Sequence, residues 1–268
     1  MNAPSPWSRR VRLARFVLDP RNAKVSAQKI VQRRHAVAEH EPAVAWADAI
    51  AVDSDAWIRS RDAGLADEAE RAVAEAEAAE RSHQRIAEMG GAADCALAYW
   101  LVRHLQPDVV VETGVAAGWS SRAFLTALEA NGHGRLLSSD LPYPGMTDSD
   151  AMVGVVVPEG LRDRWRLDLD GDDKNLRRFV RTLTRIDLFH FDSDKSRAGR
   201  SRAMALVEPL LTPSTVVVMD DIGDNLWFRD WVAGSNWNHE VLRSGGKFVG
   251  IATRTGDLRL SHGPASAA

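Results

Sequence analysis

The chain has little of what marks secreted, membrane-spanning or nucleic-acid-binding proteins. Its 268 residues include one cysteine, Cys95, so no internal disulfide can form. The thiol lies in the apolar stretch 93–102, as expected of a buried structural group in a reducing compartment. No run of about 18 apolar residues is present, so we expect no membrane span. The formal net charge of −3 provides no overall basic field for nucleic acid or lipid. These features predict a cytoplasmic protein with neither kind of partner.

The N-terminal part of the chain changes charge abruptly. Residues 1–35 hold nine Lys or Arg and one acid, whereas residues 37–80 hold twelve acids and three Arg. The start lacks the continuous apolar core of a secretory signal. Either a solvated basic tail precedes an acidic helical face, or the tail docks on that face in its own or a neighbouring subunit. Strong helix formers fill residues 53–89, and Gly90-Gly91 should end that helix.

Short apolar runs then alternate with helical stretches through most of the remaining chain. The runs cover residues 108–113, 135–140, 165–169, 186–191 and 214–221. This alternation predicts an α/β fold with a doubly wound, mostly parallel sheet that has helices on both faces. Late in the chain, residues 247–261 resemble a hairpin that turns at Thr255-Gly256. We therefore predict a basic extension over 1–50, a helical extension over 51–90, and the main domain over 91–268.

A glycine-bearing turn follows the first apolar run, in the sequence ETGVAAGWSS (112–121). Glycine permits a tight turn and a close backbone approach, and the start of the following helix offers free N–H groups to an anion. We expect Ser120 or Ser121 to cap that helix. The spacing is neither the Gly-x-Gly-x-x-Gly of pyrophosphate binders nor a Walker loop. The second run ends at Asp140, whose carboxylate can accept hydrogen bonds from two neighbouring hydroxyls.

This turn and the later acid resemble the cofactor site of class I S-adenosylmethionine-dependent methyltransferases. The resemblance implies a Rossmann-like, seven-stranded sheet, and S-adenosyl-L-methionine as the cofactor. Its amino-acid end would be held by Glu112, Gly114, Gly118 and Ser120, and its ribose by Asp140. By position, the adenine would lie beside Asp170, Gly171 and Asp172, and a covering segment would include Met89 and Gly90. A nucleotide-binding domain of the same class with a different ligand is the alternative.

Further acids follow two more apolar runs. Asp192, Asp194 and Lys195 come after the run at 186–191, and Asp220 and Asp221 end the run at 214–221. If these strands are neighbours, the acids meet at the carboxyl edge of the sheet, where ligands bind in such folds. Unpaired carboxylates would repel one another there, and a hard cation such as Mg²⁺ prefers oxygen ligands of this kind. A solvated turn pair and a helix cap are the simpler alternatives.

The segments DSDK (192–195) and MDDIGDNLW (219–227) resemble those of cation-dependent O-methyltransferases of the catechol and caffeoyl-CoA type, and of related natural-product sugar O-methyltransferases. The resemblance implies that Asp192, Asp220 and Asp221 bind the metal. It implies that Lys195 removes a proton from the substrate hydroxyl, and we place Asp194 in a supporting position. Asp221 stands where these enzymes commonly carry asparagine.

These observations predict metal-dependent methyl transfer from S-adenosylmethionine to a hydroxyl of a small metabolite, a vicinal diol of a phenol or a sugar. The alternatives are a metal-independent methyltransferase on the same fold and a non-catalytic cofactor-binding scaffold. The N-terminal helices suggest a homodimer.

Several features near these segments have two interpretations. Trp119, Trp227, Trp231 and Trp237 either line a substrate pocket or pack in the core. The segment 141–160 is either a lid or a variable insertion. His190, inside a strand run, is expected to be a core histidine with its hydrogen bonds satisfied.

Overall fold

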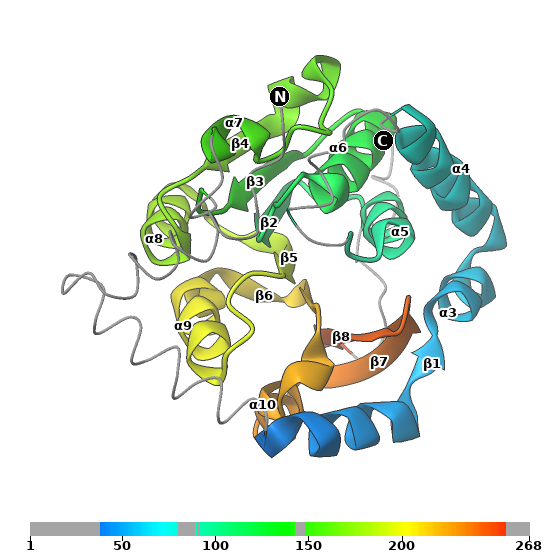
Figure 1. The fold of residues 1–268 in the computed structure, drawn as a ribbon, viewed down its shortest axis with the longest axis vertical. Helices are drawn as coiled ribbons and strands as arrows, with labels where there is room; N and C mark the ends of the chain where they lie inside the picture. Colours follow the sequence, from blue (N-terminus) through cyan, green and yellow to red (C-terminus); the bar gives the residue numbers. More distant parts are fainter. Residues whose placement is uncertain (1–37, 80–88, 90–91, 143–147, 256–268) are drawn as a thin grey trace, which may run out of the picture.

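The structure is a computed structural model that describes residues 38–79, 89, 92–142 and 148–255. One eight-stranded sheet runs through it in the order β1-β7-β8-β6-β5-β2-β3-β4 (Figure 1). All neighbouring strands are parallel except β8, which is antiparallel to both β6 and β7. The strands are β1 (Val52–Asp53), β2 (Val109–Thr113), β3 (Arg135–Ser139), β4 (Trp165–Asp168), β5 (Ile186–Phe191), β6 (Leu211–Met219), β7 (Asn238–Ser244) and β8 (Lys247–Thr253). The predicted doubly wound, mostly parallel sheet is confirmed, and the two-residue β1 adds an eighth strand at its edge.

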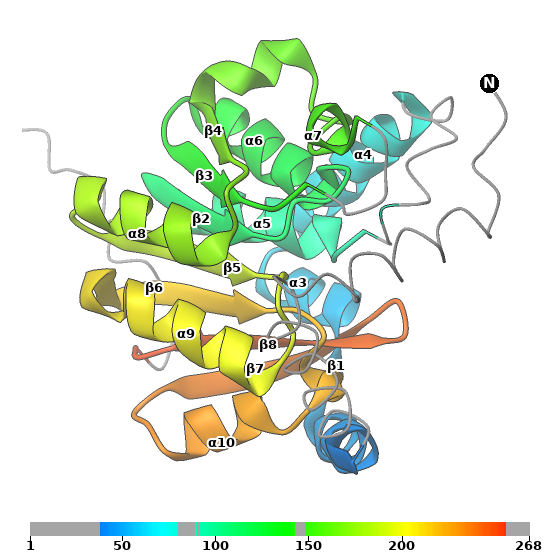
Figure 2. The ribbon, with the colours of Figure 1, turned by 60° about the vertical axis from the view of Figure 1, so that its left-hand side comes forward.

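Helices cover both faces of this sheet (Figure 2). The helices are α3 (Ser54–Arg61), α4 (Ala63–Ala79), α5 (Cys95–Leu105), α6 (Trp119–Asn131), α7 (Ser149–Met152), α8 (Asp172–Thr182), α9 (Arg197–Val207) and α10 (Trp227–Ala233), with 3₁₀ turns at η3 (Glu159–Arg164), η4 (Glu208–Leu210) and η5 (Ile222–Asp224). Helices α3 to α6 share one buried cluster with Val110 of β2, whereas α8 to α10 share the other with Val109 and Val111. Consecutive residues of β2 therefore face opposite layers, which is why its sequence is continuously apolar.

The single helix predicted over 53–89 is two helices in the structure. Asp62 breaks it, because its backbone is extended and its Oδ1 accepts a hydrogen bond of 2.9 Å from the amide of Leu65 at the start of α4. An aspartate at this position satisfies an otherwise free amide at the start of a helix. The predicted helix end at Gly90-Gly91 lies outside the described residues. No helix in the described part of the chain combines the length and the apolar character needed to cross a membrane.

The C-terminal hairpin lies earlier in the chain than predicted. Strands β7 and β8 form an antiparallel pair, and the turn between them consists of Gly245 and Gly246, which have φ angles of 55° and 81°. Two positive φ angles suit the tight turns that join antiparallel strands, so Gly-Gly was the stronger turn signal. Residues 247–253, predicted as the first strand of the hairpin, form its second strand. The part of the predicted hairpin after Thr255 lies outside the described residues.

Residues 38–50 form a helix that lies beside α10 (Figure 1). Its Trp46 ring lies 6.4 Å from the Phe228 ring, measured between centroids. Trp231 stacks on Trp227 at 5.5 Å and contacts Trp237 at 5.4 Å, and all three belong to or pack against the core cluster beneath α10. Core packing therefore accounts for these three tryptophans.

Gly250 provides a test of this packing. A Cβ atom at this β8 position would lie 2.6 and 2.7 Å from two atoms of the buried Phe228 ring. We expect Gly250→Ala to lower the free energy of unfolding by about 1–3 kcal/mol, because the ring must shift in a packed core. Urea unfolding measures this. The control is Gly160→Ala, which meets no atom within 4 Å; equal stability of the two variants would contradict the packing described here.

Candidate active site

The glycine turn after β2 lies directly against the loop after β5. Gly114 has a φ of 82°, and a Cβ there would lie 2.6 Å from the carbonyl carbon of Asp192. Gly118 has a φ of 98°, and a Cβ there would lie 2.8 Å from Cα of Gly154. Both glycines are therefore required by conformation and by space. The turn predicted to hold a cofactor therefore lies directly against the backbone of Asp192, one of the acids predicted to hold a metal.

Helix α6 begins differently from the prediction. It starts at Trp119, and Gly118 is its N-cap without a side-chain hydrogen bond. The predicted caps, Ser120 and Ser121, instead donate hydrogen bonds of 2.5 Å each to the carboxylate of Glu112. The prediction of a serine cap is wrong, because the glycine turn places both serines inside the first helical turn.

Glu112 is completely buried and holds the start of α6 against the sheet. Besides Ser120 and Ser121, the hydroxyl of Ser138 on β3 donates to it at 2.7 Å. Burial raises the pKa of Glu112 to about 7, although the three hydroxyls oppose the shift. Nearby His190 is also buried, its Nδ1 has no hydrogen-bond partner among the described residues, and burial lowers its pKa to about 4. His190 is thus a core residue, as predicted, but one with an unsatisfied nitrogen.

Asp140 is tied to the glycine turn. Its Oδ2 accepts hydrogen bonds of 2.9 and 2.8 Å from the amides of Val115 and Ala116, and its Oδ1 accepts one of 2.6 Å from Leu141. These bonds hold Ala116 in a left-handed conformation with a φ of 50°. The carboxylate predicted to bind ribose hydroxyls therefore lies at the turn, where it already orders the backbone.

The two acids considered for the adenine have different surroundings. Asp170 is exposed and forms an ion pair of 2.6 Å with Arg178. Asp172 accepts hydrogen bonds from Ser139 at 2.7 Å and from Ser193 at 2.5 Å, and burial raises its pKa. Asp172 therefore links the ends of β3 and β5, whereas Asp170 forms an ion pair with the surface of α8.

The segment predicted as a lid or an insertion packs on the glycine turn. The amides of Gly154 and Val156 donate to the carbonyls of Ala116 and Ala117 at 2.9 and 3.0 Å. Met89, predicted as a covering residue, is buried in an apolar cluster that includes Val115 and Ala117 of the turn. Its neighbour Gly90 and the loop 143–147 lie outside the described residues.

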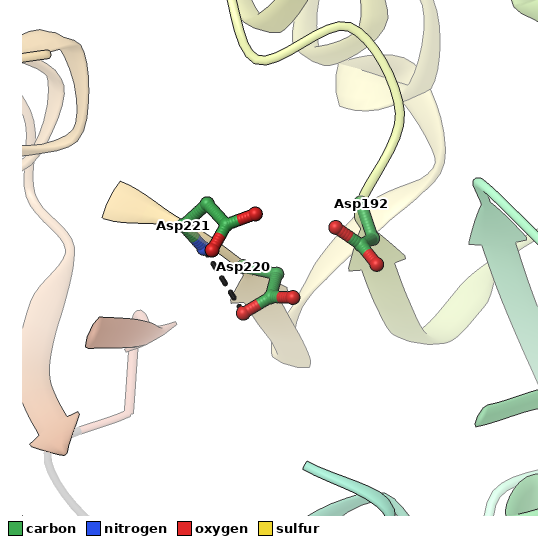
Figure 3. Close-up of side chains that lie close together, drawn as sticks. All are labelled: Asp192, Asp220 and Asp221. Atoms are coloured by element: carbon green, nitrogen blue, oxygen red, sulfur yellow. Dashed lines mark hydrogen bonds between the residues drawn. The ribbon is translucent and has the colours of Figure 1, made fainter. Parts of the chain in front are cut away.

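Three carboxylates meet at the ends of β5 and β6, which are paired neighbours in the sheet (Figure 3). Asp192, Asp220 and Asp221 each offer an oxygen, and these atoms lie within 4.8 Å of one another. Burial raises the pKa of Asp220 to about 6, and the charges of Asp192 and Asp221 add to this effect. Asp220 Oδ1 accepts a hydrogen bond from the Asp221 amide, whereas its Oδ2 is buried with no hydrogen-bond partner among the described residues.

Two lysines contact this carboxylate cluster. Lys195 Nζ forms ion pairs with Asp192 and, at 2.5 Å, with Asp221. Burial alone would lower the pKa of Lys195, but Asp192, Asp221 and Asp220 together hold it above its usual value. Lys247 Nζ lies 3.3 Å from Asp221 Oδ1 and 3.9 Å from Asp220 Oδ2. Lys195 is therefore an ammonium ion in this arrangement.

Asp194, expected to support the cluster, points elsewhere. It pairs with Arg202 at 3.0 Å on the exposed side of α9. Asn225, which the sequence reasoning missed, donates to the carbonyl of Lys195 at 2.7 Å and accepts from the amide of Trp227 at 3.1 Å. Its position just after Asp220 and Asp221 was the available signal. Lys247 had no such signal, because it belongs to a distant strand.

The N-terminal helix also contacts the loops that carry these groups. Glu39 accepts hydrogen bonds of 3.0 Å from Arg197 and 3.2 Å from the amide of Leu226. His40 Nδ1 lies 3.0 Å from the carbonyl of Gly223. Residues 38–50 therefore contact the segments that follow both acid-bearing strands, β5 and β6.

A cavity of about 250 Å³ opens between α4, α5 and α6. Trp119 lines it, unlike Trp227, Trp231 and Trp237, which belong to or pack against the core cluster at α10. Its other lining residues include Ala76, Cys95, Tyr99, Arg122 and Ser244. Cys95, predicted to be buried, is only partly buried because it lines this cavity. Its surroundings raise the pKa of its thiol to about 12, which disfavours the reactive thiolate.

Comparison with known proteins identifies the class of domain. Residues 111–222 match a family model described as a methyltransferase domain. Solved structures of the same fold include the O-methyltransferase TomG of Streptomyces achromogenes, involved in tomaymycin synthesis and solved with S-adenosylmethionine. The TM-score is 0.52 at 17% identity, covering 68% of this chain and 88% of that one. No curated protein sequence matches the chain.

Two further solved structures agree. A Podospora anserina methyltransferase with bound S-adenosylhomocysteine gives a TM-score of 0.52 at 15% identity, with 68% of this chain and 87% of that one covered. A Geobacter sulfurreducens methyltransferase gives 0.51 at 18% identity, with 69% and 90% covered. The matched segment contains the glycine turn, Asp140 and all three clustered carboxylates. The match over residues 111–222 and the shared fold agree with the resemblance to class I methyltransferases.

Because Glu112 is buried, we predict that the stability of the folded protein depends on pH. Its pKa rises from an ordinary value of 4.5 to about 7 on folding, so the folded protein binds this proton more tightly than the unfolded chain does. This contribution to stability is complete below about pH 4.5 and is lost as the pH rises to about 7. Its size is about 3 kcal/mol, from the difference between the two pKa values.

Glu112→Gln should remove this dependence. The variant's free energy of urea unfolding, relative to the wild type, should rise between pH 5 and pH 8. A difference that stays flat across this range would show that Glu112 is ionised at all of these pH values.

Proposed function

We propose that this protein is a cation-dependent O-methyltransferase, which transfers the methyl group of S-adenosyl-L-methionine to a hydroxyl of a small metabolite. The observation that carries the proposal is the carboxylate cluster at the ends of β5 and β6, beside the glycine turn. The domain match supports methyl transfer, and relatives of this fold were solved with S-adenosylmethionine or S-adenosylhomocysteine. A cation that binds two neighbouring oxygens favours a vicinal diol of a phenol or a sugar as the acceptor.

The donor atoms fit a divalent cation. Asp192, Asp220 and Asp221 offer only oxygen, the ligand that Mg²⁺ prefers. The buried Oδ2 of Asp220 has no hydrogen-bond partner among the described residues, and a cation would satisfy it. The Lys195 ammonium pairs with one oxygen of Asp192 and one oxygen of Asp221 in this structure. A cation bound to the same carboxylates would repel the ammonium and weaken these ion pairs.

The weakening of these ion pairs would give Lys195 its chemical role. When bound, S-adenosylmethionine supplies an electrophilic methyl group and the cation supplies a Lewis acid that lowers the pKa of the acceptor hydroxyl. Lys195 Nζ takes the hydroxyl proton. Its pKa is high here because of the aspartates, so without these contacts burial favours the neutral amine that a base requires.

The turn from Gly114 to Gly118 and Asp140 would bind and orient the cofactor next to this cluster. Gly114 lets the turn approach the Asp192 backbone, which brings the two binding sites together. Orientation of this kind accounts for a large share of catalysis in group transfer. A cytoplasmic homodimer without nucleic-acid or membrane partners completes the proposal.

One alternative has specific support. The ion pairs of Lys195 with Asp192 and Asp221 neutralise much of the cluster without a metal. This favours a methyltransferase in which the acids and Lys195 bind the substrate directly.

A chelator distinguishes these two mechanisms. We expect protein stripped with EDTA to lose methyl transfer to a catechol or sugar-diol panel and to regain it with Mg²⁺ or Mn²⁺. Calorimetry with S-adenosylmethionine should show binding to the same sample. Full turnover by the stripped protein would select the metal-independent alternative, and no cofactor binding at all would contradict the methyltransferase assignment.

Substitutions of Lys195 test whether this residue acts as a general base or only as an ion-pair partner of the carboxylates. Arginine keeps the positive charge but does not give up its proton in proteins. We expect both Lys195→Met and Lys195→Arg to lower kcat by about 10²–10⁴, the usual contribution of a general base, with cofactor affinity unchanged. Turnover by Lys195→Arg close to that of the wild type would show that Lys195 supplies only charge.

A further inference from the structure

We propose that Arg200 is a positioning residue that fixes the Asp220–Asp221 backbone and thereby sets the spacing of the three clustered carboxylates. This inference rests on the proposed cation-dependent function. Arg200 lies on α9, the helix that follows the loop bearing Asp192 and Lys195. It contacts the other acid-bearing loop, after β6. Arg200 therefore connects the two chain segments that contribute carboxylates.

The contacts of Arg200 are specific. Its side chain is completely buried, and Nη2 donates hydrogen bonds of 3.0 Å to the carbonyl of Asp220 and 2.9 Å to the carbonyl of Asp221. The amide of Arg200 bonds to the carbonyl of Ser196 at 3.0 Å, so its own position is set by the first turn of α9. One guanidinium nitrogen thus holds two consecutive peptide groups.

The backbone at Asp221 explains why such a contact is needed. Asp221 has φ and ψ angles of 51° and 42°, in the left-handed region. Residues with a Cβ adopt this region at a cost, although aspartate and asparagine tolerate it better than most. The Arg200 hydrogen bonds stabilise this conformation from the carbonyl side. Relaxation of Asp221 would turn its side chain away from Asp192 and Asp220.

The charge of Arg200 suits the same role. Burial lowers the pKa of the Arg200 guanidinium, and the charges of the aspartates 224, 221, 220 and 192 oppose this effect. A guanidinium nevertheless stays ionised in proteins. Its Nε and Nη1 have no hydrogen-bond partner among the described residues, so nearby negative charge is the main compensation for its burial. In the proposed mechanism the ion pairs of Lys195 weaken when the cation binds, whereas Arg200 remains held by two carbonyls.

Mn²⁺ binding tests this inference without any need for turnover. We expect Arg200→Met to weaken Mn²⁺ affinity by about 10- to 100-fold, the loss typical when a residue supporting metal ligands is removed. Affinity for S-adenosylmethionine should stay unchanged, because the side-chain hydrogen bonds of Arg200 go to the Asp220 and Asp221 carbonyls and not to the glycine turn. Electron paramagnetic resonance of free Mn²⁺ gives the first affinity, and calorimetry gives the second.

Two control variants on α9 isolate the effect. Arg202→Met removes the same charge from the exposed side of the helix, where Arg202 pairs with Asp194. Met204→Ala removes a buried side chain from the same helix without touching the Asp220 or Asp221 carbonyls. We expect Mn²⁺ affinity close to that of the wild type in both, even where Met204→Ala lowers stability.

The outcomes are distinguishable. Wild-type protein that binds S-adenosylmethionine but no Mn²⁺ would overturn the cation dependence on which this inference rests. Wild-type and Arg200→Met proteins that bind Mn²⁺ equally would overturn the role of Arg200 alone. If Arg200→Met does not fold, Arg200→Lys decides, because one ammonium cannot reproduce the guanidinium geometry. A reduced Mn²⁺ affinity in that variant supports the proposal, and an unchanged one contradicts it.

Discussion

The arrangement of the candidate site depends on the close approach between Gly114 and the backbone of Asp192. Strands β2 and β5 are parallel neighbours, so the chain leaves both of them at the same edge of the sheet. Any side chain at position 114 would collide with the Asp192 peptide group. Because glycine has no side chain, the glycine turn can lie directly against the backbone of Asp192, which carries one carboxylate of the cluster. A methyl donor held by one and an acceptor held by the other could then react without further movement of the sheet.

Charge is the second constraint, because carboxylates that lie this close together are unstable alone. Among the described residues, Arg200, Lys195 and Lys247 lie around the cluster of Asp192, Asp220 and Asp221, and their burial differs. Arg200 is completely buried and bonded to two carbonyls, whereas the side chains of Lys195 and Lys247 are partly exposed. In the proposed mechanism, the buried Arg200 charge maintains the site while the more exposed lysines respond to the bound cation or substrate.

Sequence patterns predicted most of the sheet and the meeting of the acids. Both follow from short-range rules: continuous apolar runs such as 186–191 form buried parallel strands, and the residues after such strands meet at one edge. Contacts between distant segments were not predictable in the same way. Arg200 carries no local signal for its carbonyl contacts, and Lys247 reaches Asp221 only because β8 lies beside β6. The hairpin was misplaced because two glycine turn signals, at 245 and 256, lie close together in the sequence.

The identity of residue 221 follows from its backbone conformation and from the charges around it. Its left-handed backbone favours aspartate or asparagine over most other side chains, which explains why either can stand at this position. Aspartate adds a negative charge, and Lys247 lies 3.3 Å from the oxygen that Lys195 does not contact. An asparagine would leave Lys247 without this ionic partner. The aspartate and the β8 lysine therefore belong together, and Asp221 can accept the extra charge because the neighbouring strand supplies its counter-ion.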